Sequence, residues 1–155
     1  MKMTLVQLAT AAFLFRNDIH YLHHNVEGSG FLEAHDHFGE LYERAISDFD
    51  FFAENAIVTG EVTRFPNMSN IADLPDSVFS GWNVVHNTES ELGIEQAYEY
   101  LVANGNDYIE ALNMGVEYAS DEGFNDVEGK LDEMKEFWNL NVNYKGRRIT
   151  GKKGD

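Results

Sequence analysis

Apolar residues recur every three or four positions over most of the chain, which is the period of an amphipathic α-helix. One such run predicts a helix that reaches about Val26 and ends before Gly28 and Gly30, since glycine can take the positive φ of a helix end. A second run predicts a helix from Phe31 to near Gly60. The expected buried faces of these two helices are Leu5, Leu8, Ala12, Phe15, Ile19, Leu22 and Val26, and Phe31, His35, Phe38, Tyr42, Ala45, Phe49, Ala53 and Ala56.

The helical period returns after an irregular connection at residues 61–89, which holds both prolines of the chain. Within this connection the stretch DLPDSVFSGWNVV, residues 73–85, is compatible with a short helix. The next helix is predicted to begin near Ile94, and Gly105 and Gly115 on its apolar face indicate close packing against another helix. After a break at residues 121–123, Asn125 and Glu128 predict a capping box for the last helix. Its expected buried residues are Val127, Leu131, Met134 and Trp138.

Two pairs of helices joined by a long crossover predict an all-α fold, a ferritin-like four-helix bundle. We expect residues 1–143 to form this bundle as one domain, and residues 144–155 to form a basic C-terminal tail with a mobile end. The apolar spacing of the first predicted helix continues past Arg16, which argues against reading the N-terminal apolar run as a signal peptide. No stretch reaches the roughly 18 apolar residues of a membrane span. Cysteine is absent, which excludes disulfides and thiolate metal sites. We therefore expect a soluble, cytoplasmic protein.

The chain is strongly acidic, but its charge is unevenly distributed. It has 27 acidic and 11 basic residues and a net charge of −16. The last eleven residues, KGRRITGKKGD, hold five of the eleven Lys and Arg and one acid, so the other 144 residues carry six basic and 26 acidic side chains, a net of −20. Such a body attracts cations and repels nucleic acid, whereas the tail has the opposite tendency.

Five of the six histidines lie around one glycine-rich turn, in the stretch HYLHHNVEGSGFLEAHDH. This turn brings His23, at the end of one predicted helix, near His35 at the start of the next. Farther along the second helix, Asp50 and Glu54 are one turn apart, so their carboxylates can point the same way. We expect both acids on the shoulder of the apolar face, where burial requires a counter-charge or a metal.

The distance between these two pairs determines how they can cooperate. His35 and Asp50 are separated by fifteen residues, or roughly 22 Å of helical rise, which a single metal ion cannot bridge. If the four residues form one site, a second copy of the chain must supply the acids. A two-fold dimer would form such a site twice.

The run H-x-N-V-x-G-x-x-F-x-x-x-H, from His23 to His35, followed by Asp50-x-x-x-Glu54, resembles the ferroxidase signature of the Dps family, the miniferritins. The residue types and all three gaps agree in this region, and the rest of the chain agrees in the length and order of its helices. The resemblance implies that the two histidines of one subunit and the two acids of its dimer mate bind non-haem iron. These four residues would then be both the catalytic and the metal-binding residues.

Two positions depart from the family pattern. His24 stands where the family usually has tryptophan, and Gly39 stands where it often has an acid. The four principal ligands remain despite both changes. The departures bear on the occupancy of a second iron position.

The leading hypothesis is therefore a ferroxidase, an oxidoreductase that acts on iron with peroxide or oxygen as oxidant, and an iron store. By the same resemblance, about twelve subunits built from two-fold dimers form a hollow shell that collects ferric iron and protects against oxidative damage. The acids Asp121, Glu122 and Asp126 are then either a solvated loop or the lining of a pore that conducts cations.

Two alternatives involve little or no ferroxidase activity. One is a nucleoid protein that binds DNA, although the acidic body opposes it, and the other is a purely structural shell. The cations of the tail that would contact DNA are Lys145, Arg147, Arg148, Lys152 and Lys153.

The candidate ligands also have simpler interpretations. Taken singly, a histidine is more readily explained as a helix cap or a surface residue. That interpretation applies to His20, His24, His37 and His86. For the pair Asp50 and Glu54 the simpler interpretation is an interface ion pair, and the candidate arginines are Arg16, Arg44 and Arg64.

Overall fold

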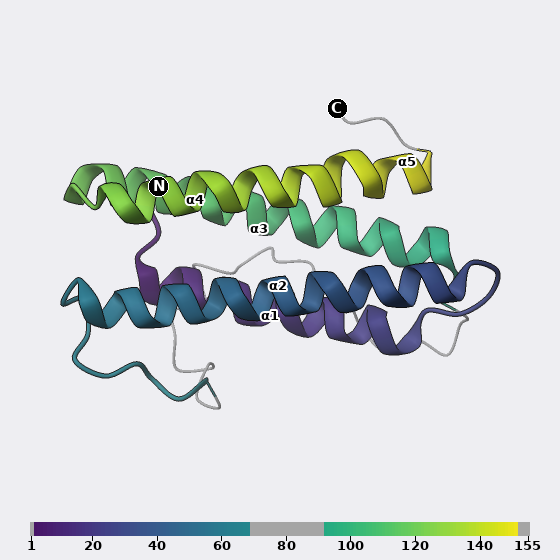
Figure 1. Ribbon diagram of the computed structural model, residues 1–155, viewed down its shortest axis with the longest axis horizontal. Helices are drawn as coiled ribbons and strands as arrows, with labels where there is room; N and C mark the ends of the chain where they lie inside the picture. The colour runs from purple at the N-terminus through teal and green to yellow at the C-terminus, as the bar shows by residue number, and fades with distance from the viewer. Residues whose placement is uncertain (1, 69–91, 152–155) are drawn as a thin grey trace.

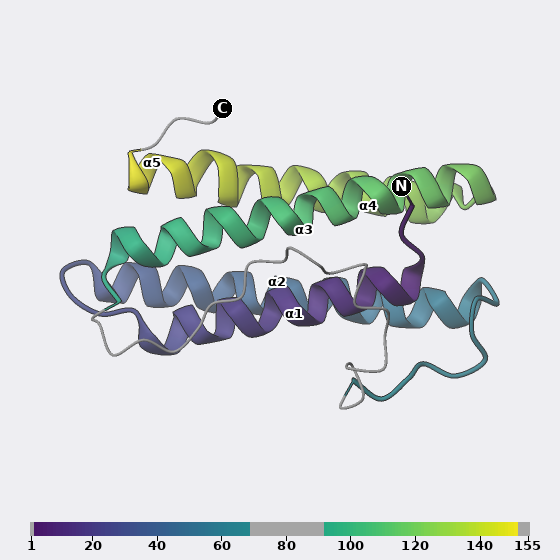
Figure 2. The ribbon, with the colours of Figure 1, turned by 180° about the vertical axis from the view of Figure 1, so that it is seen from behind.

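In a computed structural model, which describes residues 2–68 and 92–151, the chain folds into long helices that lie side by side along one axis (Figure 1). The four main helices are α1 (Leu5–Asn25), α2 (Phe31–Val58), α3 (Ile94–Glu122) and α4 (Asn125–Trp138). Helix α1 packs mainly against α2, and α3 packs against α4 and α1, so the bundle consists of two helix pairs (Figure 2). No β-strand occurs within the described ranges. The predicted all-α four-helix bundle is confirmed.

Part of the predicted crossover cannot be compared with the structure. The short helix expected within residues 73–85 and the sixth histidine, His86, lie outside the described residues. Across residues 2–68 and 92–151, no helix combines the length and apolar character that a membrane crossing requires.

The ends of α1 and α2 follow local backbone chemistry. Gly28 and Gly30 in the turn between them have φ of 100° and 86°, the left-handed region that the sequence predicts for these glycines. At the other end of the bundle, the carboxylate of Glu61 accepts hydrogen bonds from the backbone N–H groups of Leu5 and Val6 at 2.9 and 2.8 Å. A negative charge at this position stabilises the N-terminus of α1 and ties it to the segment that follows α2.

Two glycines of α3 bring neighbouring helices into close contact, as their position on the apolar face predicts. A Cβ added at Gly105 would lie 2.5 Å from Cγ2 of Val142, and one at Gly115 would lie 2.6 Å from Cδ1 of Leu8. Both distances are shorter than any ordinary carbon–carbon contact. The absence of a side chain therefore allows α1 and the C-terminal helical segment to approach the α3 backbone.

The buried face of α4 is as predicted, but its N-terminus is not. Val127, Leu131, Met134 and Trp138 are all buried. The expected capping box is wrong, because Asn125 is the first helical residue and Phe124 takes the cap position without a side-chain hydrogen bond. The left-handed conformation of Gly123 and a backbone hydrogen bond from Phe124 N–H to Ala119 O end α3 so tightly that the next helix starts immediately.

The buried face of α2 is rotated relative to the face that the apolar pattern predicts. Its buried residues are Ala34, Phe38, Leu41, Ala45, Asp48, Phe52 and Ala56. Phe31 is exposed, and Tyr42 and Phe49 are only half-buried. The prediction failed here because the large aromatic residues lie along one flank of the helix, whereas the centre of its buried face includes a carboxylate, Asp48.

The helix that begins at Asn125 does not end at Trp138. It continues as a π-helical stretch, η3 (Asn139–Gly146), and a final short turn, α5 (Arg147–Thr150), both of which pack against α3 (Figure 1). The expected boundary between the bundle and the tail at residue 144 therefore falls inside a continuous helical segment. Lys152 and Lys153 lie outside the described residues.

Candidate metal centre

His23 and His35 lie against each other where α1 ends and α2 begins, as the sequence predicts. Their imidazole rings are stacked, with centroids 3.9 Å apart and an angle of 18° between the ring planes. The ring of Phe31, one helical turn before His35, is also stacked with the His35 ring, with centroids 5.1 Å apart. Both histidines are half-buried. The structure therefore brings two of the four candidate ligands together within one chain.

Each of these histidines is oriented by a hydrogen bond to the backbone of the other. Nδ1 of His23 lies 2.7 Å from the carbonyl oxygen of His35, and Nδ1 of His35 lies 2.8 Å from the carbonyl oxygen of His23. Because a carbonyl oxygen only accepts hydrogen bonds, both Nδ1 atoms must carry a proton. In the neutral imidazoles the two Nε2 atoms are then unprotonated, which is the state in which histidine binds a metal.

Gly39 provides the space that this arrangement requires. A Cβ at Gly39 would lie 3.1 Å from Cε1 and 3.4 Å from Nδ1 of His23, closer than most side-chain contacts. The ring of His23 therefore lies directly over the α2 backbone, where it reaches the carbonyl group of His35. An acid at this position, which the Dps pattern often has, would require the ring to shift by a few tenths of an ångström.

His20 and His24 form a second pair on the exposed side of α1. Their Nε2 atoms are 2.9 Å apart, and their rings are nearly perpendicular, with centroids 4.4 Å apart. His20 also packs against the ring of Tyr42 at 4.7 Å. Burial lowers the pKa of His20 below its usual value, with a further contribution from the neighbouring His24. These two residues contact each other rather than capping the helix.

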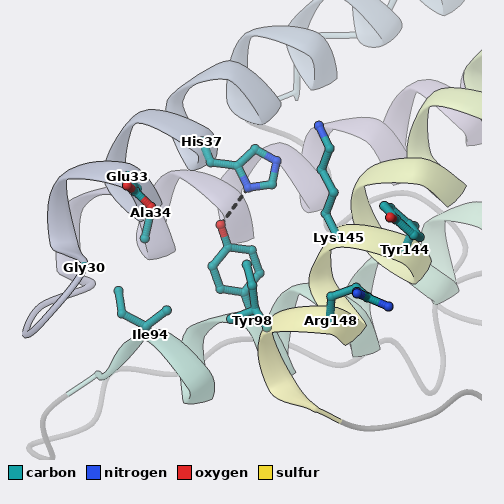
Figure 3. Close-up of a pocket in the computed structure, with 10 residues that line it drawn as sticks. Gly30, Glu33, Ala34, His37, Ile94, Tyr98, Tyr144, Lys145 and Arg148 are labelled. Carbon is teal, nitrogen blue, oxygen red and sulfur yellow. Dashed lines mark hydrogen bonds between the residues drawn. The ribbon is translucent and has the colours of Figure 1, made fainter.

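His37 has a structural role, although it is neither a helix cap nor a surface residue, because it is half-buried between α3 and the C-terminal helical segment. Its Nε2 donates to Oδ1 of Asn141 at 3.0 Å, and its Nδ1 accepts from the hydroxyl group of Tyr98 at 2.6 Å (Figure 3). Both ring nitrogens are thus occupied by protein groups. Burial, with a smaller contribution from Glu33, raises the pKa of Tyr98 to about 12, so this hydroxyl remains a donor at neutral pH.

A pocket of about 520 Å³ lies beside His37 at the end of the bundle where α2 and α3 begin and α5 ends (Figure 3). Ile94 and Tyr98 contribute apolar surface, whereas Lys145 and Arg148 contribute positive charge. None of the four candidate iron ligands lines this pocket. Two cations of the predicted basic tail are therefore held by helical backbone next to the histidine turn.

Asp50 and Glu54 lie on the opposite side of α2 from its buried face. Both residues are exposed in the single chain, in line with Glu43 two turns before Asp50 and three before Glu54. Their expected place on the shoulder of the apolar face is therefore wrong for one chain alone. Arg44, which the sequence offers as a counter-charge, instead binds Asp48 and Glu133. In the described part of the chain, no ion pair involves Asp50 or Glu54.

The two candidate pairs do not meet within one chain. Helix α2 is continuous from Phe31 to Val58, so the roughly 22 Å of helical rise between His35 and Asp50 is preserved. Across residues 2–68 and 92–151 of one chain, no three His, Asp or Glu side chains gather closely enough to hold a metal. A site that includes all four residues therefore requires a second chain.

Asp48 is a buried acid that the sequence analysis did not single out. Its Oδ2 accepts hydrogen bonds from Tyr108 and Trp138 at 2.9 and 2.8 Å, and Arg44 binds its Oδ1 at 3.2 Å. Burial raises the pKa of Asp48 above its usual value, and these donors oppose that change. Its position three residues after Ala45 and four before Phe52, both on the buried face, was the signal in the sequence.

The acids of the turn between α3 and α4 are all exposed, and Asp121 forms a salt bridge with Lys2. Glu122 and Asp126 are also exposed. In a single chain, the exposure of these three acids agrees both with a solvated turn and with the rim of a pore between subunits.

Similarity of structure to known proteins identifies the fold, whereas the sequence comparisons find no match. No protein-family model matches the chain, and no curated protein matches it in sequence. Dps from Listeria innocua superposes with a TM-score of 0.82 at 17% identity, over 99% of this chain and 98% of that one. Dps from Staphylococcus aureus superposes with a TM-score of 0.76 at 18% identity, over 94% of this chain and 91% of that one. The Helicobacter cinaedi protein CAIP has a TM-score of 0.74 at 16% identity, over 94% and 96%.

These likenesses define the class of fold as a ferritin-like four-helix bundle. Within that class, the chain has the fold of the Dps proteins, the miniferritins, over nearly its whole described length.

Proposed function

We propose that this protein is a Dps-like miniferritin that binds and oxidises Fe²⁺ at sites shared between two subunits and stores the ferric product in a hollow shell. His23 and His35 of one chain, together with Asp50 and Glu54 of a two-fold-related chain, would hold the iron. The proposal combines the sequence resemblance, the Dps fold and the chemistry of the two residue pairs.

The observation that carries the proposal is the pair of reciprocal hydrogen bonds between His23 and His35. Each ring donates its Nδ1 proton to the backbone carbonyl of the other at 2.7 and 2.8 Å, which leaves Nε2 as the metal-binding atom. Metal-binding histidines commonly donate their second ring nitrogen to a carbonyl or carboxylate group, because this bond orients the ring. An ordinary surface histidine does not need such a constraint.

The exposed acids supply the second part of the argument. Asp50 and Glu54 are four residues apart on α2, so their carboxylates face the same side, and no ion pair in the described part of the chain neutralises them. A two-fold axis that crosses α2 would bring this pair toward the histidines of the mate, and the same contact would occur twice. A mixed set of imidazoles and carboxylates with open positions suits Fe²⁺.

Iron is the substrate and the cargo in this scheme. Two Fe²⁺ ions each lose one electron, and one peroxide molecule takes both electrons and two protons to become two water molecules. Molecular oxygen would serve as the alternative oxidant. The negative charge of the protein, −16 per chain, favours the approach of Fe²⁺, and Asp121, Glu122 and Asp126 would line the entry.

Complementation between two inactive variants tests shared ligation. One variant carries His23→Ala and His35→Ala, and the other carries Asp50→Ala and Glu54→Ala. Each heterodimer would contain one intact site and one that lacks all four ligands. With random mixing, half of the dimers are heterodimers, so refolded mixtures should recover about a quarter of the wild-type iron oxidation rate. The rate is measured with anaerobically loaded Fe²⁺ after addition of peroxide.

Two controls make this experiment specific. Each parent variant refolded alone should remain inactive, and Glu43→Ala, which removes an exposed acid two turns before Asp50, should keep the full rate. A mixture that is no more active than its parents, although both variants fold and assemble, would contradict the shared site.

A further inference from the structure

We infer that His20 and His24 form a separate binding site for divalent metals that prefer nitrogen ligands, with Cu²⁺ bound most tightly and Zn²⁺ and Ni²⁺ more weakly. This site is distinct from the proposed iron centre and does not depend on iron oxidation. The site spans one helical turn on the exposed side of α1 and uses the Nε2 atoms of the two residues.

The geometry of the pair matches what one metal ion requires. The two Nε2 atoms are 2.9 Å apart. Two nitrogens bound to one ion at about 2.0–2.1 Å, with an angle of roughly 90–110° between the bonds, lie about 2.9–3.4 Å apart. The chain therefore already holds both donor atoms at the separation of neighbouring ligands around one ion.

A metal ion can take the place of the proton that lies between the two Nε2 atoms. Since the two nitrogens are in contact, one Nε2 carries the shared proton and the other accepts it. No hydrogen bond occupies Nδ1 of either ring in the described part of the chain, so that proton can move to Nδ1 of its own ring. Both imidazoles then remain neutral and present unprotonated Nε2 atoms to the ion.

The surroundings favour an exchangeable ion rather than a permanently enclosed one. Both side chains are exposed, and within the described residues no third His, Asp or Glu joins them, so water would fill the other positions. The ring of Tyr42 packs against His20 and restricts its orientation, which lowers the cost of ordering the pair. With two imidazoles as the only protein ligands, affinity should follow the usual order in which Cu²⁺ exceeds Zn²⁺ and Ni²⁺ and far exceeds Fe²⁺.

The two histidine pairs on α1 are separate although they are neighbours in sequence. The rings of His23 and His24 have centroids 5.0 Å apart and are steeply inclined, at 68°. The Nδ1 of His23 is bound to the carbonyl of His35, whereas His24 contacts His20. One pair is therefore built across the turn to α2, and the other is built along α1.

Titration of the intact assembly with Cu²⁺, delivered as its glycine complex, tests this site. Glycine competes with weak surface carboxylates, so binding that remains reports a genuine chelate. The titration is carried out in His23→Ala/His35→Ala, because the imidazoles of the proposed iron site would also bind Cu²⁺. We expect about one Cu²⁺ per chain of this variant, with electron paramagnetic resonance showing coupling to two imidazole nitrogens. Adding His20→Ala/His24→Ala to it should abolish this signal.

A matched variant in the same His23→Ala/His35→Ala background separates the pair from histidine content in general. Adding Asn17→His/His20→Ala keeps the number of histidines but places His24 seven residues, or about 10 Å of rise, from its new partner, so the signal should be lost. Absence of the copper signal in His23→Ala/His35→Ala, or a signal that survives the addition of His20→Ala/His24→Ala, would overturn the assignment whatever the outcome for iron.

Discussion

Asp48 is the carboxylate that connects three helices at the centre of the bundle. It lies on α2, and its Oδ2 accepts hydrogen bonds from Tyr108 of α3 and Trp138 at the end of α4. The aromatic rings of these two donors pack at right angles with centroids 5.7 Å apart, next to the ring of Phe15. A single acid therefore satisfies two buried donors that would otherwise be costly in an apolar core.

We predict that replacing Asp48 destabilises the protein far more than replacing an exposed acid. Asp48→Ala leaves the Tyr108 hydroxyl group and the Trp138 indole N–H without partners, and should cost on the order of 3 kcal/mol. Asp48→Asn retains an acceptor oxygen and should cost about half as much. Denaturant unfolding followed by circular dichroism measures both, with Glu43→Ala as control. Equal stabilities for Asp48→Ala and Glu43→Ala would show that this network contributes little.

At the scale of single residues, the sequence predicted which side chains meet but not how they are oriented. The spacing from His23 to His35 correctly predicted that the two side chains meet. The reciprocal bonds to backbone carbonyl groups, and the space over Gly39 that permits them, depend on the angle between α1 and α2. Nothing in a linear spacing gives that angle.

Among the helices, the close approach of neighbouring backbones to α3 depends on its glycines. We predict that Gly105→Ala destabilises the fold by roughly 1–3 kcal/mol, although alanine favours a helix, because the new Cβ would meet a branched and buried side chain, Val142, at 2.5 Å. Gly129→Ala, on the exposed side of α4 with nothing within 4 Å, should instead stabilise by about 1 kcal/mol. Thermal unfolding of both variants provides the measurement. A Gly105→Ala variant as stable as Gly129→Ala would mean that the C-terminal segment does not pack as described.

Helix existence and order were predictable because long amphipathic runs carry a strong period, as in α3. The rotation of α2 was not, since a pattern that counts aromatic residues as buried and acids as exposed assigns Tyr42 and Asp48 to the wrong sides. The continuation of α4 into η3 and α5 was also missed. Residues 139–150 show few apolar positions, and Gly146 is buried because the backbone itself packs near Val102.

For the whole molecule, the raised pKa values of the buried Tyr98 and the half-buried Tyr118 predict how stability depends on alkaline pH. Burial raises the pKa of Tyr98 and Tyr118 to about 12, with added contributions from Glu33 and from the Glu61 hydrogen bond respectively. A folded pKa above the unfolded value of about 10 means that the stabilisation is complete below pH 10 and is lost as pH rises toward 12. Tyrosinate absorbance and circular dichroism recorded against pH should therefore show late ionisation that coincides with loss of helix. Ionisation of all seven tyrosines near pH 10 in a fully helical protein would contradict this.

We also expect several copies of the chain to assemble into one particle, and exposed apolar residues of α2 support this expectation. Leu32 is 71% exposed near the start of α2, and Val58 is 79% exposed at its end, on the helix that also presents Asp50 and Glu54. Phe52 of the same helix is buried within its own chain and so is not available to a mate. Because Leu32 and Val58 lie along α2 with the exposed acids Asp50 and Glu54, a contact along this helix that completes the proposed iron sites would also cover apolar side chains.

We predict that the protein forms a closed particle with about twelve times the 17.6 kDa mass of the chain, a size that follows from the Dps resemblance. Because each chain carries a net charge of −16, added salt should strengthen the assembly by screening repulsion between copies. Leu32→Lys/Val58→Lys should shift the population toward smaller species while each chain keeps its helical content. Light scattering at low and moderate salt measures both effects. A stable species at the mass of a single chain under all these conditions would rule out the shell, and with it any iron site completed by a second chain.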